Sequence, residues 1–242
     1  AKGLSAALDI PFVGIDHIRA HLYAPHLEAD ISYPYLGLLV SGGHTVICLV
    51  RSMDEMEVLG TTIDDAIGEA FDKIAKHYRF GYPGGVAVDT LASTGDPDAF
   101  NFPKPKLKKI YRKYDVSYSG LKTAAINQAD KFRVKDDAVA ADLAASFQKR
   151  AVSIIIDVLD EALADTGIAR LAVGGGVAAN SRLRRELKTL AQRRNVGLYI
   201  PSHLLCTDNG AMIAGLGYHL LKRGEYAGFS ETVTARVDAF KS

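Results

Sequence analysis

Three consecutive glycines, Gly174 to Gly176, constrain the fold of this chain more than any other feature. They follow a short apolar run, Leu171–Val173, that predicts a buried strand, and they precede a basic segment, Ser181–Arg194, that predicts a helix. A strand that turns directly into a helix is the building unit of α/β proteins. The same turn places a helix N-terminus beside a strand end, where a phosphate or sugar can bind. We therefore expect an α/β fold with a ligand at this turn. Asn180 can serve as the N-cap of that helix, but a cap does not require three glycines.

The remaining pattern also alternates strands and helices. Tyr35–Val40 and Thr45–Val50 predict a hairpin closed by the tight turn Ser41-Gly42-Gly43-His44, and Met56–Thr62 predicts a third strand. The other expected elements are strands over Pro11–Ile15 and Val196–Ile200, and helices over His17–Glu28, Asp64–Tyr78, Gly120–Phe132, Asp136–Thr166 (with at most one break) and Thr207–Lys222.

Composition identifies no partner by itself. The 242 residues carry a formal net charge of +1, so affinity for nucleic acid must come from local patches. The longest apolar runs, such as Leu36–Val40, are far shorter than the roughly 20 residues of a membrane span. Cys48 and Cys206 lack metal-ligand spacing and cannot build a disulfide framework. Because the chain opens on a helix-like pattern without a cleavage site, we expect a cytoplasmic protein that is part of a longer fold.

His17 and His21 are the first candidate metal ligands. Four residues apart on a helix, their imidazoles share one face and can hold one ion, although two ordinary surface histidines are an equal alternative. A zinc peptidase of this pattern would need Glu as its general base at position 18, where this chain has Ile18. Asp208 precedes the last expected helix and can either cap it or add a carboxylate to the metal.

Two further segments can approach an anion or a sugar. The small residues of the Ser41–His44 turn allow backbone N–H groups to surround a phosphate, although a plain hairpin turn is the simpler interpretation. Asp65, Glu69 and Asp72 share a helix face, where like charges repel. A solvated acidic face is one interpretation, but a nearby cation or ribose explains the cluster better.

The segment from Lys104 to Tyr114 is a candidate tRNA-binding loop. It alternates basic residues with two tyrosines, a combination that suits phosphate neutralisation and base stacking, although a solvated run of charges is an equal alternative. Its basic residues are Lys104, Lys106, Lys108, Lys109, Arg112 and Lys113. The basic residues of the expected helix over Ser181–Arg194 form a second candidate surface.

The order of these motifs closely resembles the TsaD family, the tRNA N6-adenosine threonylcarbamoyltransferases formerly called O-sialoglycoprotein endopeptidases or glycoproteases. The motifs are His-x-x-x-His from His17, Leu-Val-Ser-Gly-Gly-His-Thr from Leu39, Ile-Asp-Asp-Ala-x-Gly-Glu-Ala-Phe-Asp-Lys from Ile63, Tyr-Pro-Gly-Gly from Tyr82, Ser-Gly-Leu-Lys-Thr from Ser119, Gly-Gly-Val-Ala-Ala-Asn from Gly175 and Cys-Thr-Asp-Asn-Gly-Ala-Met-Ile from Cys206.

The resemblance implies an actin-like ATPase fold (ASKHA, RNase H-like) with two lobes and a ligand cleft between them. Residues 1 to about 50 would be the remainder of the first lobe, about 51–222 the second lobe with inserted helices, and 223–242 a C-terminal tail. The family begins with a Gly-Ile-Glu-Thr-Ser-Cys-Asp-type strand and turn that this chain lacks. We therefore expect an N-terminally truncated member whose first lobe is incomplete.

The resemblance also implies an acyltransferase activity. The family transfers a threonylcarbamoyl group from threonylcarbamoyl-AMP to the exocyclic amine of the adenosine 3′ to the anticodon, in tRNAs that read codons beginning with A. Its motifs assign one divalent metal ion, iron or zinc, to His17, His21 and Asp208. They assign the substrate or adenine nucleotide to Leu39, Val40, Ser41, Gly42, Gly43, Asp72, Gly85, Asp89 and Asn180. The implied partners are tRNA, a TsaB-like paralogue and a TsaE-like ATPase. No residue stands out as the general base.

Three alternatives remain open. A metallopeptidase is disfavoured by Ile18. A non-catalytic nucleotide-binding scaffold of the same complex is consistent with an incomplete first lobe. A carbamoyltransferase for a small molecule is the third, and the basic loop favours tRNA over it.

Overall fold

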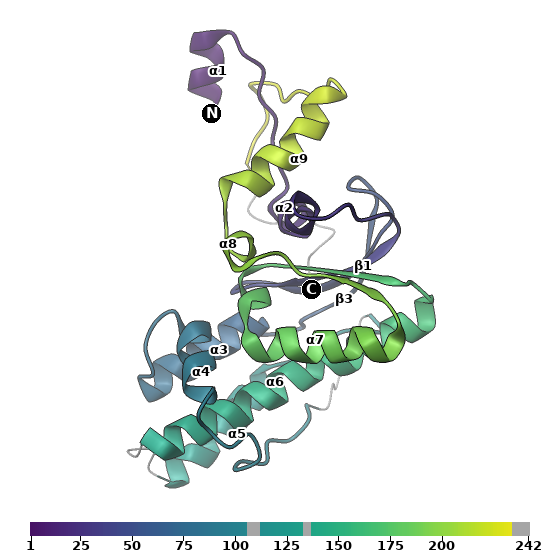
Figure 1. Cartoon of the computed structure of the whole chain (residues 1–242). Coiled ribbons are helices and arrows are strands. Elements are labelled where there is room, and N and C mark those ends of the chain that lie inside the picture. The colour runs from purple at the N-terminus through teal and green to yellow at the C-terminus, as the bar shows by residue number, and fades with distance from the viewer. Residues whose placement is uncertain (106–111, 133–136, 234–242) are drawn as a thin grey trace.

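The computed structural model describes residues 1–105, 112–132 and 137–233, and its ribbon is drawn in Figure 1. Within these residues a five-stranded sheet has the order β3-β2-β1-β4-β5. Its strands are β1 (Tyr35–Val40), β2 (Thr45–Val50), β3 (Met56–Thr61), β4 (Arg170–Gly174) and β5 (Gly197–Tyr199). The described helices are α1 (Lys2–Leu8), α2 (His17–Tyr23), η1 (Ala24–Leu27), α3 (Ile67–Tyr78), α4 (Gly84–Ala92), α5 (Ser119–Phe132), α6 (Asp137–Thr166), η2 (Gly176–Ala179), α7 (Ser181–Arg194), α8 (His203–Cys206) and α9 (Gly210–Lys222).

Strand β1 lies at the centre of the sheet. It pairs antiparallel with β2, where Val40 opposes Thr45, so the predicted hairpin is confirmed. Its other edge pairs in parallel with β4, where Leu36 opposes Leu171. All six residues of β1 are buried, because helices cover both faces of the sheet at this strand. The predicted α/β class is therefore confirmed, and the ends of β1 and β4 that lead into turns lie at the same edge.

Two apolar cores form on the two faces of the sheet. Helices α3 to α7 cover one face, where Leu36 and Leu38 of β1 join a large core that contains Phe71 and Phe147. Helices α2 and α9 cover the opposite face, where the alternate residue Leu39 points into a smaller core. The period-two alternation of β1 thus fixes which helices each side chain meets.

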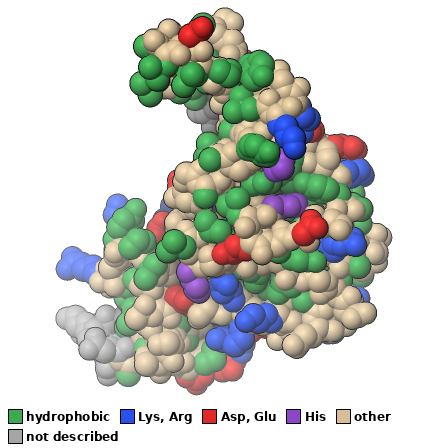
Figure 2. Space-filling view, turned by 45° about the horizontal axis from the view of Figure 1, so that its top comes forward, with side chains coloured by type: hydrophobic (Ala, Val, Ile, Leu, Met, Phe, Trp, Pro, Cys, Tyr) green, Lys and Arg blue, Asp and Glu red, His purple; other side chains and the backbone are tan. Residues whose placement is uncertain are grey.

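Helix α2 lies very close to the sheet. A Cβ on Gly37 of β1 would be 2.9 Å from the Sγ atom of Cys48 and 3.1 Å from the Cδ2 atom of Leu22 on α2. Only glycine leaves room for this approach, so Gly37 allows α2 to pack directly on β1. Helix α1 projects beyond α2 and α9 on the same side of the sheet. Its Leu4 and Leu8 side chains are exposed, and Figure 2 shows hydrophobic side chains on the surface of the part that projects.

Several sequence expectations are corrected. Residues 11–15 are not a strand; the backbone hydrogen bond that anchors them joins the Ala227 N–H to the Phe12 carbonyl. The helix expected from His17 ends at Tyr23 and continues as the 3₁₀ turn η1, which contains Pro25. Helix α6 runs unbroken through 30 residues, and among the described helices none has the length and apolar character to cross a membrane.

Candidate metal and substrate site

His17, His21 and Asp208 meet although they come from opposite ends of the chain. Asp16 caps α2 by accepting a hydrogen bond from the Arg19 N–H, which fixes the turn that carries both histidines. The Oδ1 atom of Asp208 lies 3.4 Å from the Nε2 atom of His17 and 3.0 Å from that of His21. The three candidate ligand atoms lie within 4.8 Å of one another. Two imidazole nitrogens and one carboxylate are a donor set that zinc or iron accepts with positions left for substrate.

The two histidines differ in exposure. His21 is buried at 2% exposure, whereas the side chain of His17 is half exposed. Burial lowers the pKa of His21, nearby His17 lowers it further, and Asp208 opposes both effects. The imidazole of His21 is therefore neutral at pH 7, which is the form that binds a metal.

Asp208 is not used as a helix cap. Helix α9 begins at Gly210, and the side chain of Asn209 caps it by accepting a hydrogen bond from the Met212 N–H at 2.9 Å. The carboxylate of Asp208 therefore faces the two histidines, and its side chain is 78% exposed. The sequence left two interpretations of Asp208 open, a helix cap and a metal ligand, and the structure excludes the helix cap.

The triple glycine is explained largely by packing. A Cβ on Gly174 would lie 2.2 Å from the carbonyl oxygen of His21, and one on Gly175 would lie 2.3 Å from that of Val40. Gly175 also has φ +93°, a region that other residues rarely adopt. These contacts hold α2 and the end of β1 directly against the end of β4. A Cβ on Gly176 would meet only the Cγ2 atom of Thr207, at 3.8 Å, so close packing explains Gly174 and Gly175 but not Gly176.

The turn after β1 is tight and abuts α3. The N–H of Ser41 donates to the His44 carbonyl at 2.8 Å, and the Ser41 hydroxyl accepts from the His44 N–H. A Cβ on Gly68, at the start of α3, would lie 2.5 Å from the Ser41 carbonyl oxygen. Leu39 and Val40 are completely buried, backbone included, so of the residues predicted here only the turn from Ser41 to Gly43 is open to solvent.

The acidic cluster before and within α3 separates into distinct roles. The sequence predicted a helix from Asp64, but α3 begins at Ile67. Asp64 and Asp65 therefore precede the helix and do not lie in its first turn. Asp64 accepts hydrogen bonds at the start of α5, from the Tyr118 and Ser119 N–H groups. The cluster predicted a nearby cation, and Lys73 and Lys122 supply it.

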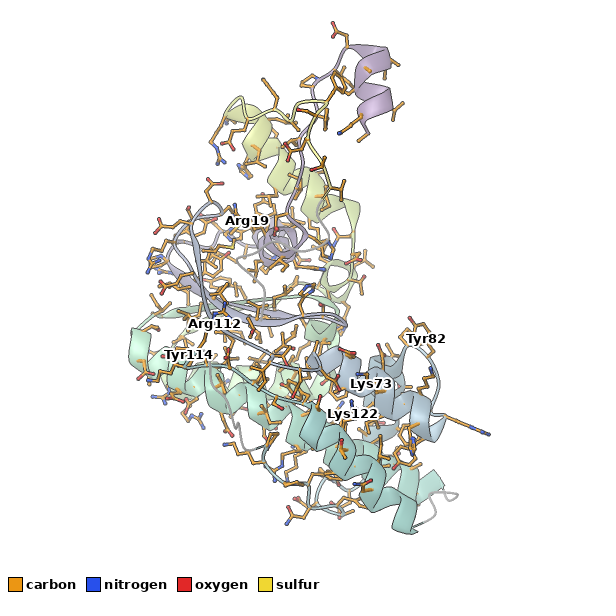
Figure 3. The ribbon with its side chains drawn as sticks, turned by 180° about the vertical axis from the view of Figure 1, so that it is seen from behind. Arg19, Lys73, Tyr82, Arg112, Tyr114 and Lys122 are labelled. Carbon is orange, nitrogen blue, oxygen red and sulfur yellow. The ribbon has the colours of Figure 1, made fainter. Side chains whose placement is uncertain are left out.

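Asp65 is paired with Lys73 at 2.5 Å and with Lys122 at 2.6 Å, and Figure 3 shows these two lysines side by side. Lys73 also pairs with Glu69 at 2.9 Å. Asp72 has a different role, because its Oδ1 atom accepts a hydrogen bond from the Gly84 N–H at the start of α4. The repulsion expected along this face is thus relieved inside the protein, and Asp72 is left beside the Gly84-Gly85 turn.

Asp89 of α4 contacts the start of α7, the helix that Asn180 caps. Asp89 accepts hydrogen bonds from the Gln148 side chain and from the N–H and hydroxyl of Ser181. Asn180 caps α7 through its Oδ1 atom, which accepts from the Leu183 N–H, so the capping role is confirmed. Its buried Nδ2 atom has no partner among the described residues and can still donate to a ligand. Gln148 and Ser181, which fix Asp89, carry no sequence signal for this role.

The basic loop is only partly described. Lys106, Lys108 and Lys109 lie outside the described residues. Lys104 pairs with Asp157 of α6 at 2.7 Å, and Lys113 pairs with Asp165 at 2.7 Å. Arg112 also has interactions within the protein. The described cations of this loop are therefore partly neutralised by the long helix.

Comparisons with known proteins give one consistent family. The family model TsaD, described as tRNA N6-adenosine threonylcarbamoyltransferase, matches residues 1–215. A protein of that name from Treponema denticola is 56% identical over 241 residues, which are 99% of this chain and 70% of that protein. One from Treponema pallidum (strain Nichols) is 47% identical, covering 99% of this chain and 68% of its own. One from Borrelia garinii subsp. bavariensis is also 47% identical, covering 100% and 71%.

Solved structures agree on the fold. Full-length HypF, crystallised in a phosphate- and nucleotide-bound form, superposes with a TM-score of 0.68 at 14% identity, covering 95% of this chain and 38% of its own. HypF from T. kodakarensis gives a TM-score of 0.70 at 13% identity, covering 93% and 39%. At this identity the similarity concerns the arrangement of helices and strands alone.

Proposed function

The chain belongs to the TsaD family of tRNA N6-adenosine threonylcarbamoyltransferases, with the ASKHA fold, and we propose that it carries out that acyl transfer on tRNA. The donor is threonylcarbamoyl-AMP. The acceptor is the exocyclic amine of the adenosine 3′ to the anticodon, in tRNAs that read codons beginning with A. The observation that carries the proposal is the convergence of His17, His21 and Asp208 in a chain 56% identical to a relative of that name.

The reaction exchanges one bond at the carbamoyl carbon. The adenosine amine attacks this carbon, a C–N bond forms, and the C–O bond of the mixed anhydride breaks. AMP leaves with the electron pair, and the amine loses one proton. We assign no residue of the chain to accept that proton.

The three ligand side chains fit one divalent ion, iron or zinc. His21 supplies a neutral buried nitrogen, and His17 supplies a more exposed one. Asp208 supplies a carboxylate that does not cap α9, because Asn209 has that role. When bound, the ion would act as a Lewis acid toward the carbamoyl or phosphate oxygens of the donor.

Other residues would hold the adenylate. The buried Nδ2 atom of Asn180 is a donor without a partner among the described residues, which suits a ribose hydroxyl or a phosphate oxygen. Asp72 can accept from a ribose hydroxyl beside Gly85, where space is open. Asp89 would act by fixing Ser181 and the start of α7. The Ser41–Gly43 turn would contribute backbone N–H groups to the phosphate.

The proposal includes further partners. We infer that the chain works with a TsaB-like paralogue and a TsaE-like ATPase, in the cytoplasm where tRNA is modified. We retain the basic loop, including Lys108 and Lys109, as a candidate tRNA contact. A peptidase remains disfavoured, because Ile18 is 6% exposed within the apolar core under α2.

The test combines metal analysis with a transfer assay. His17→Ala should remove the metal and the transfer of threonylcarbamoyl to unmodified tRNA, with little change in melting temperature, because the His17 side chain is half exposed. His203→Ala, at an exposed histidine outside the metal cluster, should retain both. Full transfer activity in metal-free His17→Ala protein would refute the metal assignment. A metal-loaded protein without transfer activity would favour a scaffold role.

A further inference from the structure

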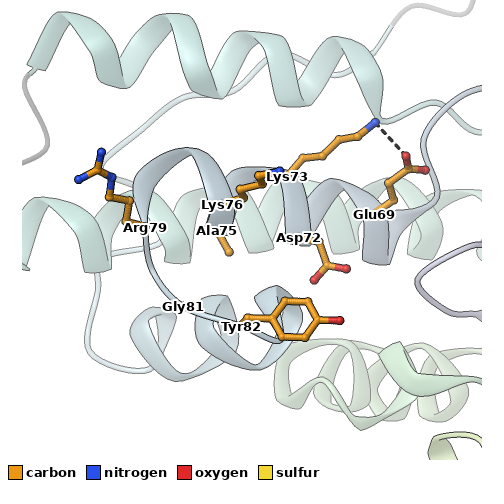
Figure 4. A pocket seen from close by; sticks show the side chains of 8 residues that line it. All are labelled: Glu69, Asp72, Lys73, Ala75, Lys76, Arg79, Gly81 and Tyr82. Atoms are coloured by element: carbon orange, nitrogen blue, oxygen red, sulfur yellow. Dashed lines mark ion pairs between the residues drawn. The ribbon is translucent and has the colours of Figure 1, made fainter.

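A surface pocket of about 480 Å³ lies beside the proposed adenylate site. It is bounded by one side of α3 and by the turn that leads into α4, as Figure 4 shows. Asp72, which we assign to the substrate, is one of its walls, and Tyr82 faces it across the opening. A large substrate whose reacting nucleotide enters the site would therefore pass over this pocket.

The cations of the pocket differ in whether the protein already uses them. Lys73 is bound to Asp65 and Glu69, and its hydrogen bonds to these carboxylates raise its pKa. Lys76 and Arg79 are exposed, and their side chains have no hydrogen-bond or ion-pair partner among the described residues. Lys76 lies in the last turn of α3, and Arg79 is the C-cap residue that ends the helix in a left-handed conformation, so both residues lie at the C-terminal end of α3. Two adjacent free cations suit successive phosphates of one strand.

Tyr82 supplies the apolar part of the same pocket. It is 90% exposed, more than any other tyrosine that the structure describes. An exposed aromatic ring beside unpaired cations is the arrangement that binds single-stranded nucleic acid, because every base can stack on the ring. Figure 3 shows Tyr82 and the pair Arg112 and Tyr114 on opposite sides of the molecule, so this surface is separate from the basic loop.

We propose that Lys76, Arg79 and Tyr82 bind the single-stranded RNA next to the target adenosine, with a base stacked on Tyr82 and phosphates on the two cations. The inference rests on the proposed function, because it places the acceptor tRNA at the opening of the same site. Lys76 and Arg79 lie farther from Asp72 along the line of α3, toward the C-terminal end of the helix, as Figure 4 shows.

A purely structural role for the two cations predicts something different. Basic residues in the last turn of a helix interact favourably with its dipole, so their loss would then lower stability and leave tRNA binding unchanged. The binding role predicts weaker tRNA binding with an unchanged KM for threonylcarbamoyl-AMP. The salt dependence of binding and the two KM values therefore separate the roles.

The experiment measures binding of unmodified tRNA at several salt concentrations, together with both KM values and the melting temperature. The double variant Lys76→Glu, Arg79→Glu should weaken binding and reduce the slope of log K against log salt by about 1.4, because two phosphates lose their contacts. Tyr82→Ala should raise the Kd by roughly tenfold without changing that slope. Lys76→Arg with Arg79→Lys is the matched control, because it exchanges the same two side chains and keeps both positive charges, so the salt slope should stay that of the unaltered protein.

The outcomes separate this inference from the proposed function. Binding and slopes that match the unaltered protein in all variants would overturn the inference while tRNA modification stands. A raised KM for threonylcarbamoyl-AMP in Tyr82→Ala, with tRNA binding unchanged, would overturn it by assigning the ring to the donor. Failure of the unaltered protein to modify tRNA in the presence of metal and donor would instead refute the proposed function.

Discussion

Gly84 and Gly85 offer a matched pair of substitutions at the start of α4. A Cβ on Gly84 would lie 2.5 Å from the Cα atom of Asp72 and 2.9 Å from the Cβ atom of Ala75, whereas a Cβ on Gly85 would meet nothing within 4 Å. The contact with Asp72 is to backbone, which cannot rotate away. Because carbon atoms prefer separations of about 3.5–4.0 Å, Gly84→Ala must push α3 and α4 apart by about 1 Å.

The expected magnitudes follow from these contacts. Overpacking of this kind typically costs about 1–3 kcal/mol. Gly85→Ala carries no such cost and gains part of the helix preference of alanine over glycine, which is at most about 1 kcal/mol. For a chain of this size about 1 kcal/mol shifts the melting temperature by roughly 2–4 °C. The difference between the two variants is about 1–4 kcal/mol, so Gly84→Ala should melt roughly 2–16 °C below Gly85→Ala.

Thermal unfolding of both variants under identical conditions tests this difference. The unaltered protein serves as the reference, and urea unfolding at a fixed temperature provides an independent free energy. If Gly84→Ala melts at or above Gly85→Ala, the helices do not approach as closely as described, and the contact of Asp72 with the Gly84 N–H loses its basis.

Two further predictions concern buried contacts. Burial alone would raise the pKa of Asp65, but hydrogen bonds from Lys122 and Lys73 outweigh it and lower that pKa. The ion pairs of Asp65 with the two lysines therefore stabilise the fold fully above the unfolded pKa of about 3.9, and this contribution is lost as the pH falls through the folded pKa. The Asp65→Asn substitution should therefore reduce the change with pH in the free energy of unfolding, measured with urea, between about pH 2 and 5. Gly174→Ala, whose Cβ would lie 2.2 Å from the His21 carbonyl oxygen, should displace α2 and weaken metal affinity in a chelator competition; unchanged affinity would contradict this packing.

Local patterns in the sequence predicted the local structure well. The hairpin of β1 and β2 was predictable because its turn and its alternation lie within 16 residues, from Tyr35 to Val50. The segment 11–15 has similar apolar content but is not a strand. Strand formation needs a partner edge, and no residue near this segment in the sequence supplies one. Its side chains Val13 and Ile15 instead pack near Gly217 of α9.

The sequence could nominate site residues but not assign all their roles. The spacing of His17 and His21 indicated a shared face, and the structure brings Asp208 to it. Whether Asp208 or Asn209 caps α9 depends on backbone conformation within one residue, which composition does not determine. The pairing of Asp65 with Lys122 joins residues 57 positions apart, so no periodic pattern could predict it.

The parallel pairing of β1 with β4 has a consequence for how the protein is made. The edge of β1 formed by residues 36–39 stays unpaired until residues 171–174 of β4 have been synthesised. Asp208 is synthesised after both segments. On the ribosome the nascent chain therefore presents only the histidine pair until Asp208 has been synthesised. The proposed three-ligand site can form only after Asp208 has been synthesised, so metal selection would act on a polypeptide that already contains all five strands of the described sheet.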